Sequence, residues 1–276
     1  MGIQMKQYIV DAFTDKLFKG NQAAVCVMEK WIPDDLMQNI AIENNFSETA
    51  FTVKNSDGCY DLRWFAPGGE IDFCGHATLG ASFVLFSFYE KDSSTIVFHT
   101  RQKGDFIVKR KENGITMSFP AFSLKPVPVT DLMTKAFGAK PKEAFFDRDL
   151  LCVFDSVDTI KNMNPNENDL KELGGICIGV TAKGVDGFDC VSRVFAPQLN
   201  IDEDPVTGST HCMIAPYWSS VLKKKNIKAF QASKREGVLL CEVNGESVSI
   251  TGNAVLFSSC ELNVIIDYVD LWNYGL

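Results

Sequence analysis

The side chains best suited to chemistry in this chain are two carboxylates and a histidine that lie close to glycines in the sequence. Glu48 sits between apolar residues at the start of an expected strand. A carboxylate is costly to bury there, and burial would raise its pKa toward the range useful for proton transfer. His76 directly follows Gly75, and Asp204 precedes Gly208 by four residues. The pattern indicates acid–base catalysis, although a solvent-exposed Glu48 in a turn fits the sequence equally well.

Gly75 and Gly208 each begin a segment that is apolar on all sides, residues 76–88 and 209–222. Such a segment predicts a helix that is buried all round. The first backbone N–H groups of a helix have no partner within it, and the helix dipole is positive there, so a carboxylate is a natural ligand. We therefore expect anion sites at these helix starts, with His76 held neutral by the dipole. The alternative is a pair of ordinary glycine turns.

The chain contains one sequence pattern twice. Residues 63–67 (RWFAP) recur as residues 193–197 (RVFAP) at an offset of 130, and Gly75 and Gly208 are 133 apart. Gly104 and Gly237 share the offset of 133. This order of landmarks predicts two related halves with a cleft between them, and clefts between domains are common small-molecule sites. Asp204 and His76 are both expected to face that cleft.

The sequence of each half predicts short strands around one buried helix, which gives an α+β architecture of two pseudo-symmetric lobes. A more polar helix is expected at residues 33–45, outside the first sheet. We expect the first lobe at residues 1–119 with a C-terminal tail at about 262–276, the second at 130–261, and a proline-containing linker at 120–129. The expected strands are residues 7–12, 23–28, 49–53, 60–65, 95–99, 105–109, 115–119, 150–154, 176–181, 188–195, 229–232, 238–243, 247–250 and 254–257.

Composition excludes several classes of protein. The chain has 276 residues, is 46% hydrophobic and has a net charge of −8, with no block of basic residues to bind nucleic acid. It has no apolar run long enough to cross a bilayer and no signal-peptide pattern, so we expect a soluble cytoplasmic protein without membrane or nucleic-acid partners. The nine cysteines include no Cys-x-x-Cys pair, which argues against a disulfide framework or a zinc site. Cys74 stands apart because it precedes Gly75 at a helix start.

Taken together, the motifs resemble the phenazine-biosynthesis-like (PhzF-type) isomerase family. Similarity runs from about residue 6 to residue 264. One departure is Gln22, where the family often has proline. The matching segments are residues 11–14 (DAFT), 18–25 (FKGNQAAV), 46–51 (FSETAF), 62–67 (LRWFAP), 72–78 (DFCGHAT) and 203–209 (EDPVTGS).

The resemblance implies the diaminopimelate-epimerase-like fold, with a β-barrel-like sheet around a central helix in each lobe. It implies isomerisation by proton transfer without a cofactor or a metal, on a small carboxylate substrate, by a homodimer. Glu48 would be the acid–base residue. His76 and Asp204 would be the other catalytic residues. The expected substrate-binding residues are Gly75, Gly208, Ser209 and Asn21.

The duplication also bears on the choice between one base and two. At the offset of 133, Cys74 corresponds to Thr207. Racemases of this fold use two opposed thiols, and a threonine hydroxyl cannot replace one because its pKa is far too high. A single base, Glu48, could instead move a proton between two carbons on one face. Two alternatives stay open: a thiol-dependent racemase of the same fold, and a non-catalytic ligand-binding module.

Overall fold

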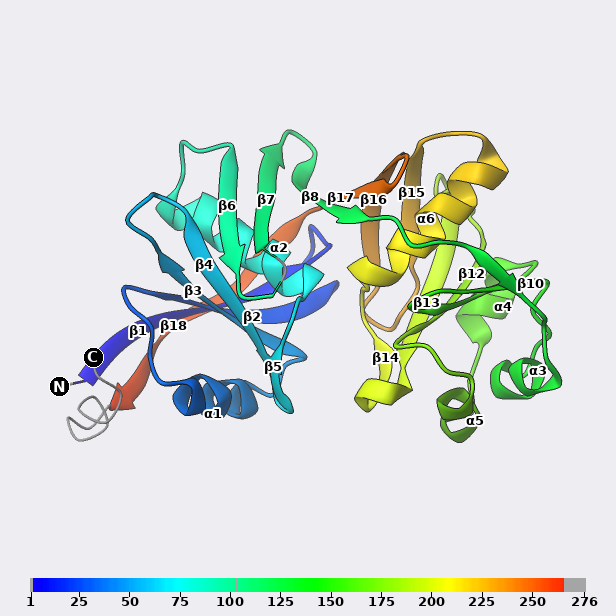
Figure 1. Ribbon diagram of the computed structural model, residues 1–276, viewed down its shortest axis with the longest axis horizontal. Helices are drawn as coiled ribbons and strands as arrows, with labels where there is room; N and C mark the ends of the chain where they lie inside the picture. Colours follow the sequence, from blue (N-terminus) through cyan, green and yellow to red (C-terminus); the bar gives the residue numbers. More distant parts are fainter. Residues whose placement is uncertain (1, 103, 266–276) are drawn as a thin grey trace. The chain divides into compact units, whose positions relative to one another are not determined.

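The computed structural model describes residues 2–102 and 104–265, and these residues form two compact units (Figure 1). The first unit comprises the described residues of Met1–Leu17, Gln22–Ile115 and Asn253–Leu276. The second comprises Phe18–Asn21 and Thr116–Gly252. Both units are mixed α+β, with sheet strands around a helix, as the sequence predicted.

The first unit is built on a mixed sheet. Its strands are β1 (Gly2–Ala12), β2 (Asn21–Met28), β3 (Glu48–Lys54), β4 (Tyr60–Ala66), β5 (Gly69–Ile71), β6 (Thr95–Thr100), β7 (Gly104–Lys111) and β18 (Ala254–Ile265). β2 runs parallel to β3, β4 pairs antiparallel with β3 and with β5, and β6 joins β4 in parallel before turning back into β7. β1 pairs antiparallel with β18 along its whole length.

The buried helix of the first unit is α2 (Gly75–Val84), which continues into a π-helical turn at Leu85–Tyr89. α2 packs against β1, β3 and β18. Nearly all of its side chains are buried, as its apolar sequence predicted. The helix α1 (Asp34–Asn44) lies on β3 and β4 and buries one face only. It begins after a proline and carries two acidic residues in its first turn, which suits the positive end of its dipole.

The second unit repeats this plan. Its strands are β8 (Gly114–Pro120), β9 (Lys125–Val127), β10 (Glu143–Phe146), β11 (Leu150–Val153), β12 (Ile178–Lys183), β13 (Cys190–Ala196), β14 (Ile201–Asp204), β15 (Asn226–Gln231), β16 (Gly237–Asn244) and β17 (Ser247–Gly252). β11 is parallel to β12, β13 is antiparallel to β12 and β14, and β15 is parallel to β13 and antiparallel to β16. The pairing order from β11 to β16 is therefore that of β2 to β7, which confirms the predicted pseudo-symmetry.

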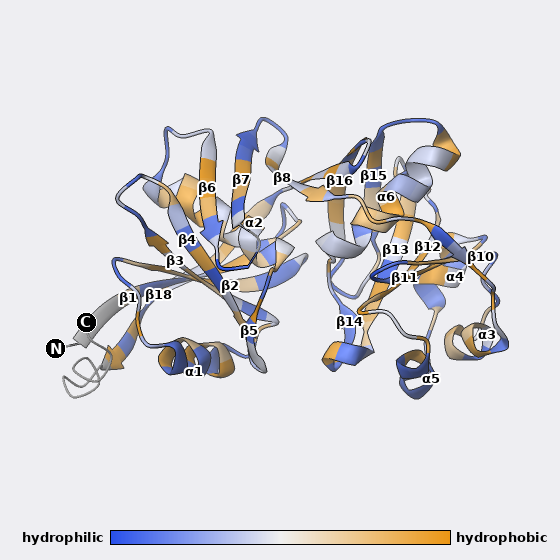
Figure 2. Cartoon of the chain, viewed as in Figure 1, coloured by the Kyte–Doolittle hydropathy of each residue, from blue (hydrophilic) through white to orange (hydrophobic). Residues whose placement is uncertain are grey.

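The central helix of this unit is α6 (Gly208–Leu222), which packs against β12, β15, β16 and β17. Gly179 of β12 lets the helix approach closely, because a Cβ added there would lie 2.7 Å from Thr210 Cγ2. Three shorter helices, α3 (Asp131–Phe137), α4 (Val157–Asn162) and α5 (Glu167–Glu172), lie outside the sheet and were not predicted. In Figure 2 the strands carry much of the hydrophobic colour, whereas α5 is hydrophilic.

The division of the chain differs from the expected one at several places. Residues 18–21 and 116–119 belong to the second unit, whereas they were expected in the first lobe. Residues 120–129 contain β9, which pairs with β10 inside the second unit, where a linker was expected. β18 pairs with β1, so residues 254–261 belong with the first unit and not with the second. The expected tail at 262–276 falls partly in β18, and its residues 266–276 lie outside the described residues.

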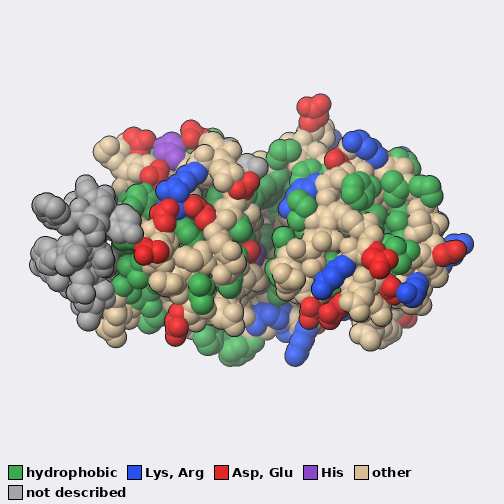
Figure 3. All heavy atoms as spheres, turned by 60° about the horizontal axis from the view of Figure 1, so that its bottom comes forward, with side chains coloured by type: hydrophobic (Ala, Val, Ile, Leu, Met, Phe, Trp, Pro, Cys, Tyr) green, Lys and Arg blue, Asp and Glu red, His purple; other side chains and the backbone are tan. Residues whose placement is uncertain are grey.

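Two further features of the described residues concern membrane-spanning helices and surface charge. Among the described residues, none of the helices combines the length and the apolar character that crossing a membrane requires. On the face in Figure 3, basic side chains are scattered in small groups among acidic ones.

Candidate functional site

Glu48 and His76 form a buried pair in the first unit. Glu48 is the first residue of β3, where it lies opposite Ala23 of β2, and His76 lies in the first turn of α2. Their side chains are 13% and 8% exposed, and Glu48 Oε2 lies 3.0 Å from His76 Nε2. The structure therefore shields the carboxylate from water and places the histidine beside it.

Cys74 is the third member of this cluster. It is buried, and its Sγ lies 3.4 Å from His76 Nδ1. It holds the position just before Gly75, the first residue of α2, and no side chain caps this helix end. The backbone N–H of Ala77 is directed at the sulfur. The open helix start thus lies next to the acid–base pair, and its positive dipole favours negative charge there.

Burial and charge together set the protonation of this cluster. Burial raises the pKa of the Glu48 carboxyl. His76 and Cys74 together lower it by more than burial raises it, so the net pKa is below its usual value. Burial lowers the pKa of His76, whereas Cys74 and Glu48 raise it, and the net pKa is well above its usual value. Burial and the charge of Glu48 raise the pKa of the Cys74 thiol to about 11. Because that thiol is uncharged at neutral pH, the Glu48 carboxylate is the charge that keeps the proton on His76.

Two expectations about protonation are therefore wrong. The sequence led us to expect a raised pKa for Glu48 and a neutral His76, on the grounds of burial and helix dipole. In the structure the two side chains are within ion-pair distance, so each stabilises the charged form of the other. This mutual attraction outweighs the cost of burying either charge.

One oxygen of Glu48 has spare hydrogen-bonding capacity. Oε2 lies within ion-pair distance of His76 Nε2, at 3.0 Å, and has no further hydrogen-bond donor among the described residues. A buried carboxylate oxygen rarely lacks a donor. The donor atoms of Glu48, Cys74 and His76 also lie within 4.8 Å of one another, so the cluster could hold a thiophilic metal ion.

The other predicted site residues gather in the second unit. Asn21 Nδ2 donates to Asp204 Oδ1 at 2.7 Å and to the carbonyl of Val206 at 3.1 Å, and the Thr207 hydroxyl donates to Asp204 Oδ2. Gln231 joins this network by donating from Nε2 to the Asp204 carbonyl at 2.7 Å. Asp204 is thus held in a fixed orientation by its neighbours.

Gly208 and Ser209 continue from this network into α6. Gly208 is the first residue of the helix and is buried, Ser209 is half-buried, and no side chain caps this end. Thr207, just before them, donates its backbone N–H to Gln231 Oε1 at 2.9 Å. The structure therefore brings Glu48 and His76 together in one unit, and the remaining predicted residues, apart from Gly75, in the other.

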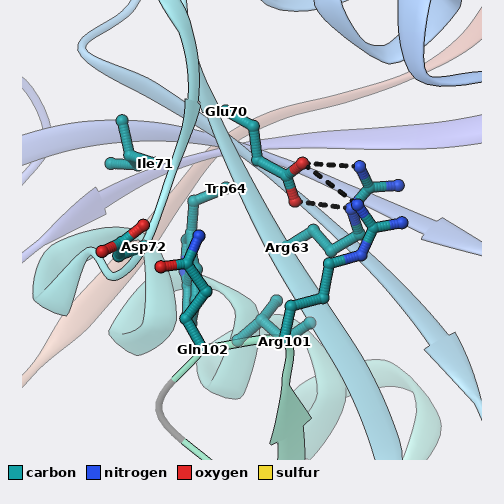
Figure 4. Close-up of a pocket in the computed structure, with 8 residues that line it drawn as sticks. Arg63, Trp64, Glu70, Ile71, Asp72, Arg101 and Gln102 are labelled. Atoms are coloured by element: carbon teal, nitrogen blue, oxygen red, sulfur yellow. Dashed lines mark hydrogen bonds and ion pairs between the residues drawn. The ribbon is translucent and has the colours of Figure 1, made fainter.

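The residues that repeat in the two halves are largely structural. Arg63 makes two parallel hydrogen bonds to Glu70, each 2.7 Å, and Arg193 does the same to Glu203 at 2.7 and 2.9 Å. Each guanidinium also lies over the phenylalanine of its own motif. Figure 4 shows the first pair lining a small pocket, with Arg101 reaching the same carboxylate. The two glutamates are 133 apart, so the offset could have revealed them, but they were missed.

The acid–base groups, in contrast, do not repeat. When the ladders β3–β4 and β12–β13 are aligned on the phenylalanine of the repeated motif, Cys177 takes the position of Glu48. The starts of α2 and α6 align Thr207 with Cys74. Burial raises the pKa of Cys177 to about 12, so it is a neutral thiol at physiological pH. The buried base is therefore confined to one half of the duplication.

Comparison with known proteins agrees with this architecture. Residues 10–260 match the family model described as phenazine biosynthesis-like protein, PhzC-PhzF. The chain belongs to this family. An uncharacterized isomerase of Pseudomonas aeruginosa is 42% identical over 262 residues, covering 95% of this chain and all of the relative.

Solved structures extend the comparison. A crystal structure of a PhzF-family phenazine biosynthesis protein from Enterococcus faecalis superposes with a TM-score of 0.92 at 45% identity, covering 95% of this chain and 100% of that chain. A hydroxyproline epimerase from Agrobacterium vitis shares the fold alone, with a TM-score of 0.60 at 9% identity, covering 97% and 94% of the two chains. This confirms the diaminopimelate-epimerase-like fold. With its relatives named as isomerases, the chain is an isomerase of the PhzF family.

Proposed function

We propose that this PhzF-family protein is a cofactor-independent isomerase in which Glu48 moves a proton on a small carboxylate substrate. The observation that carries the proposal is the state of Glu48, which is buried and charged, with one oxygen, Oε2, that has the His76 ring 3.0 Å away and no further donor among the described residues. A buried anionic oxygen of this kind is suited to accept a proton from a substrate carbon. The family explains why an isomerase is expected, and the cluster supports how it would work.

His76 supports this role in two ways. Its positive charge keeps Glu48 ionised and ready to act as a base. The same charge, next to the open N-terminus of α2, would stabilise the negative charge that develops on the substrate when the proton leaves. Glu48 would then return the proton to a second carbon on the same face.

The substrate's carboxylate is proposed to bind N–H groups at helix starts. Gly75 at the start of α2 and Gly208 at the start of α6 leave such groups without a side-chain cap. Asp204, Ser209 and Asn21 are proposed as the substrate-binding residues of the second unit. Because Asn21 and Thr207 already orient Asp204, we expect Asp204→Asn to raise KM and to lower kcat.

The experiment that tests the proposal is solvent exchange. The protein is incubated in deuterium oxide with a set of small amino and hydroxy carboxylic acids, and new deuterium on carbon is detected by mass spectrometry. We expect one compound class to incorporate label. Glu48→Gln should reduce that rate by roughly 10²–10⁴-fold, the usual contribution of a positioned acid–base group. Equal exchange in the variant would remove Glu48 from the mechanism.

The thiol-dependent racemase is the second candidate, because Cys74 Sγ lies 3.4 Å from a histidine nitrogen. The raised pKa of the Cys74 thiol opposes that role, since the thiolate is the reactive form. Cys74→Ser decides between the two: loss of activity equal to that of Glu48→Gln favours the thiol mechanism, and retained exchange favours Glu48.

A homodimer, which is also part of the proposal, is tested by light scattering during gel filtration.

A further inference from the structure

Three potential metal ligands lie together on the first unit, outside the cluster of Glu48 and His76. They are Asp57, Cys59 and His99, and one donor atom from each lies within 4.8 Å of the others. A carboxylate oxygen, a thiol sulfur and an imidazole nitrogen form a mixed donor set of the kind that Zn²⁺ accepts. None of them takes part in the proposed isomerase mechanism.

The turn between β3 and β4 holds two of these ligands in place. The Asn55 N–H donates to the Cys59 carbonyl at 2.8 Å, which closes the turn. The Cys59 N–H donates to Asp57 Oδ1 at 2.9 Å, so the turn's own backbone engages that oxygen. The other oxygen, Asp57 Oδ2, is thereby directed toward His99, whose Nε2 lies 3.2 Å away.

His99 is oriented from its other side by Asp105. The two residues are cross-strand partners on β6 and β7, and His99 Nδ1 lies 2.6 Å from Asp105 Oδ1. A histidine that binds zinc through one nitrogen commonly donates its other N–H to a carboxylate, which fixes the ring. Asp105 stands in that relation to His99 and leaves Nε2 available to bind a metal ion.

We propose that Asp57, Cys59 and His99 form a surface site for a thiophilic divalent cation of the Zn²⁺ class, with Asp105 as a positioning residue. In a tetrahedral site with bonds of about 2 Å, neighbouring ligand atoms are roughly 3.3 Å apart. The Asp57–His99 separation of 3.2 Å already matches this value. The cation replaces the proton on His99 Nε2 and the proton on the Cys59 thiol. The fourth position faces solvent, because His99 is 33% exposed and Asp57 56%.

The experiment is a titration of the full chain with Co²⁺ in a thiol-free reductant, followed by displacement with Zn²⁺. We expect saturable binding with a sulfur-to-cobalt charge-transfer band and the visible bands of tetrahedral cobalt. Cys59→Ser should abolish the charge-transfer band, and His99→Gln should weaken binding. Circular dichroism checks that both variants fold, which is expected since both side chains lie partly at the surface.

Two matched cysteine variants separate this site from other thiols. Cys260 is exposed, so Cys260→Ser should leave the cobalt spectrum unchanged. Cys74→Ser tests the buried cluster, and loss of the band in that variant alone would assign the metal to that cluster and overturn the proposal. The readout does not depend on isomerase activity, so the proposal stands or falls separately from the proposed function.

Asp105→Asn tests the positioning role. It keeps all three ligands but replaces the carboxylate that orients His99. We expect cobalt affinity to fall about 10- to 100-fold with the charge-transfer band retained at saturation. The absence of a saturable band in the wild-type chain, or an unchanged band in Cys59→Ser, would overturn the site as a whole.

Discussion

At the scale of single residues, the buried pair of Glu48 and His76 shows how two costly groups become stable together. Either charge alone would be penalised by burial. Within 3.0 Å of each other, each shifts the pKa of its partner toward the charged form. A raised histidine pKa stabilises the folded state fully below the unfolded value of 6.5, and that stabilisation is lost as the pH rises through the folded pKa. A lowered carboxyl pKa acts above the unfolded value of 4.5 and is lost as the pH falls through the folded pKa.

This balance predicts the effect of removing the carboxylate. In Glu48→Gln the attraction of the carboxylate is gone and burial still disfavours the charged imidazole, so the pKa of His76 should fall below the wild-type value. Histidine ring signals followed by NMR across a pH titration measure this directly. Urea unfolding between pH 5 and pH 9 should show the wild type losing its advantage over the variant as the pH rises through the raised pKa of His76.

His211 provides an internal reference for that titration. It is fully buried, and its two ring nitrogens lie against uncharged groups, Nδ1 at 2.7 Å from the Thr207 carbonyl and Nε2 at 3.3 Å from the Ser192 hydroxyl. Burial lowers its pKa to about 4, and Glu48→Gln should leave this value unchanged. A His76 pKa that does not move in the variant would contradict the ion-pair account.

At the scale of elements, the repeated arginine joins β4 or β13, the third strand of the common plan, to the short strand that follows it. Arg63 on β4 binds Glu70 on β5, and Arg193 on β13 binds Glu203 on β14. The paired donors and acceptors match in shape, which makes the contact specific as well as strong. The motif that first suggested a duplicated functional device is therefore one that fixes a hairpin.

Removing this arginine should be costly. The Arg63 side chain is 4% exposed and binds both Glu70 and Asp34, so Arg63→Ala leaves a cavity and removes the buried guanidinium that the two carboxylates share. We expect a loss of about 3 kcal/mol in the free energy of unfolding, the usual result of removing one partner from a buried pair. Denaturant unfolding measures it.

Arg101→Ala is the matched control, because Arg101 contacts the same two carboxylates from a side chain that is 58% exposed. An exposed ion pair of this kind contributes at most about 1 kcal/mol. Equal losses in the two variants would show that burial of Arg63 is not what makes its pair important.

At the scale of the whole molecule, the chain does not finish each unit before beginning the next. The last described strand, β18, returns to pair with β1, while β8, which follows the strands of the first half, pairs with β17. The first unit therefore depends on residues at both ends of the described chain. Backbone groups of β1 would lack their antiparallel partners without β18.

This dependence predicts the result of shortening the chain. A chain ending at residue 252 lacks β18, and we expect the amides of β1 to lose protection in hydrogen exchange and the thermal unfolding midpoint to fall. A chain ending at residue 265 keeps β18 and is the matched control. Unchanged protection of β1 in the shorter chain would mean that the β1–β18 ladder contributes little to the first unit.

The sequence by itself determined the features that arise from local pattern. Alternating and continuous apolar runs predicted the long strands and the two central helices, because the spacing of apolar residues along the chain indicates which face of an element is buried. The sequence placed Glu48 at the start of a strand but left a buried and an exposed carboxylate equally compatible, and the structure shows the buried one. Short strands such as β5 and β14, of 3 and 4 residues, escaped because so few residues carry no periodic signal.

Only the tertiary structure decided which groups face one another. The charges of Glu48 and His76 follow from a 3.0 Å contact between residues 28 positions apart, and no local pattern specifies it. The same is true of Asp57, Cys59 and His99, which strand pairing brings together from a turn and from a distant strand. Protonation and metal affinity depend on distance and burial in space, whereas secondary structure depends mainly on neighbours along the chain.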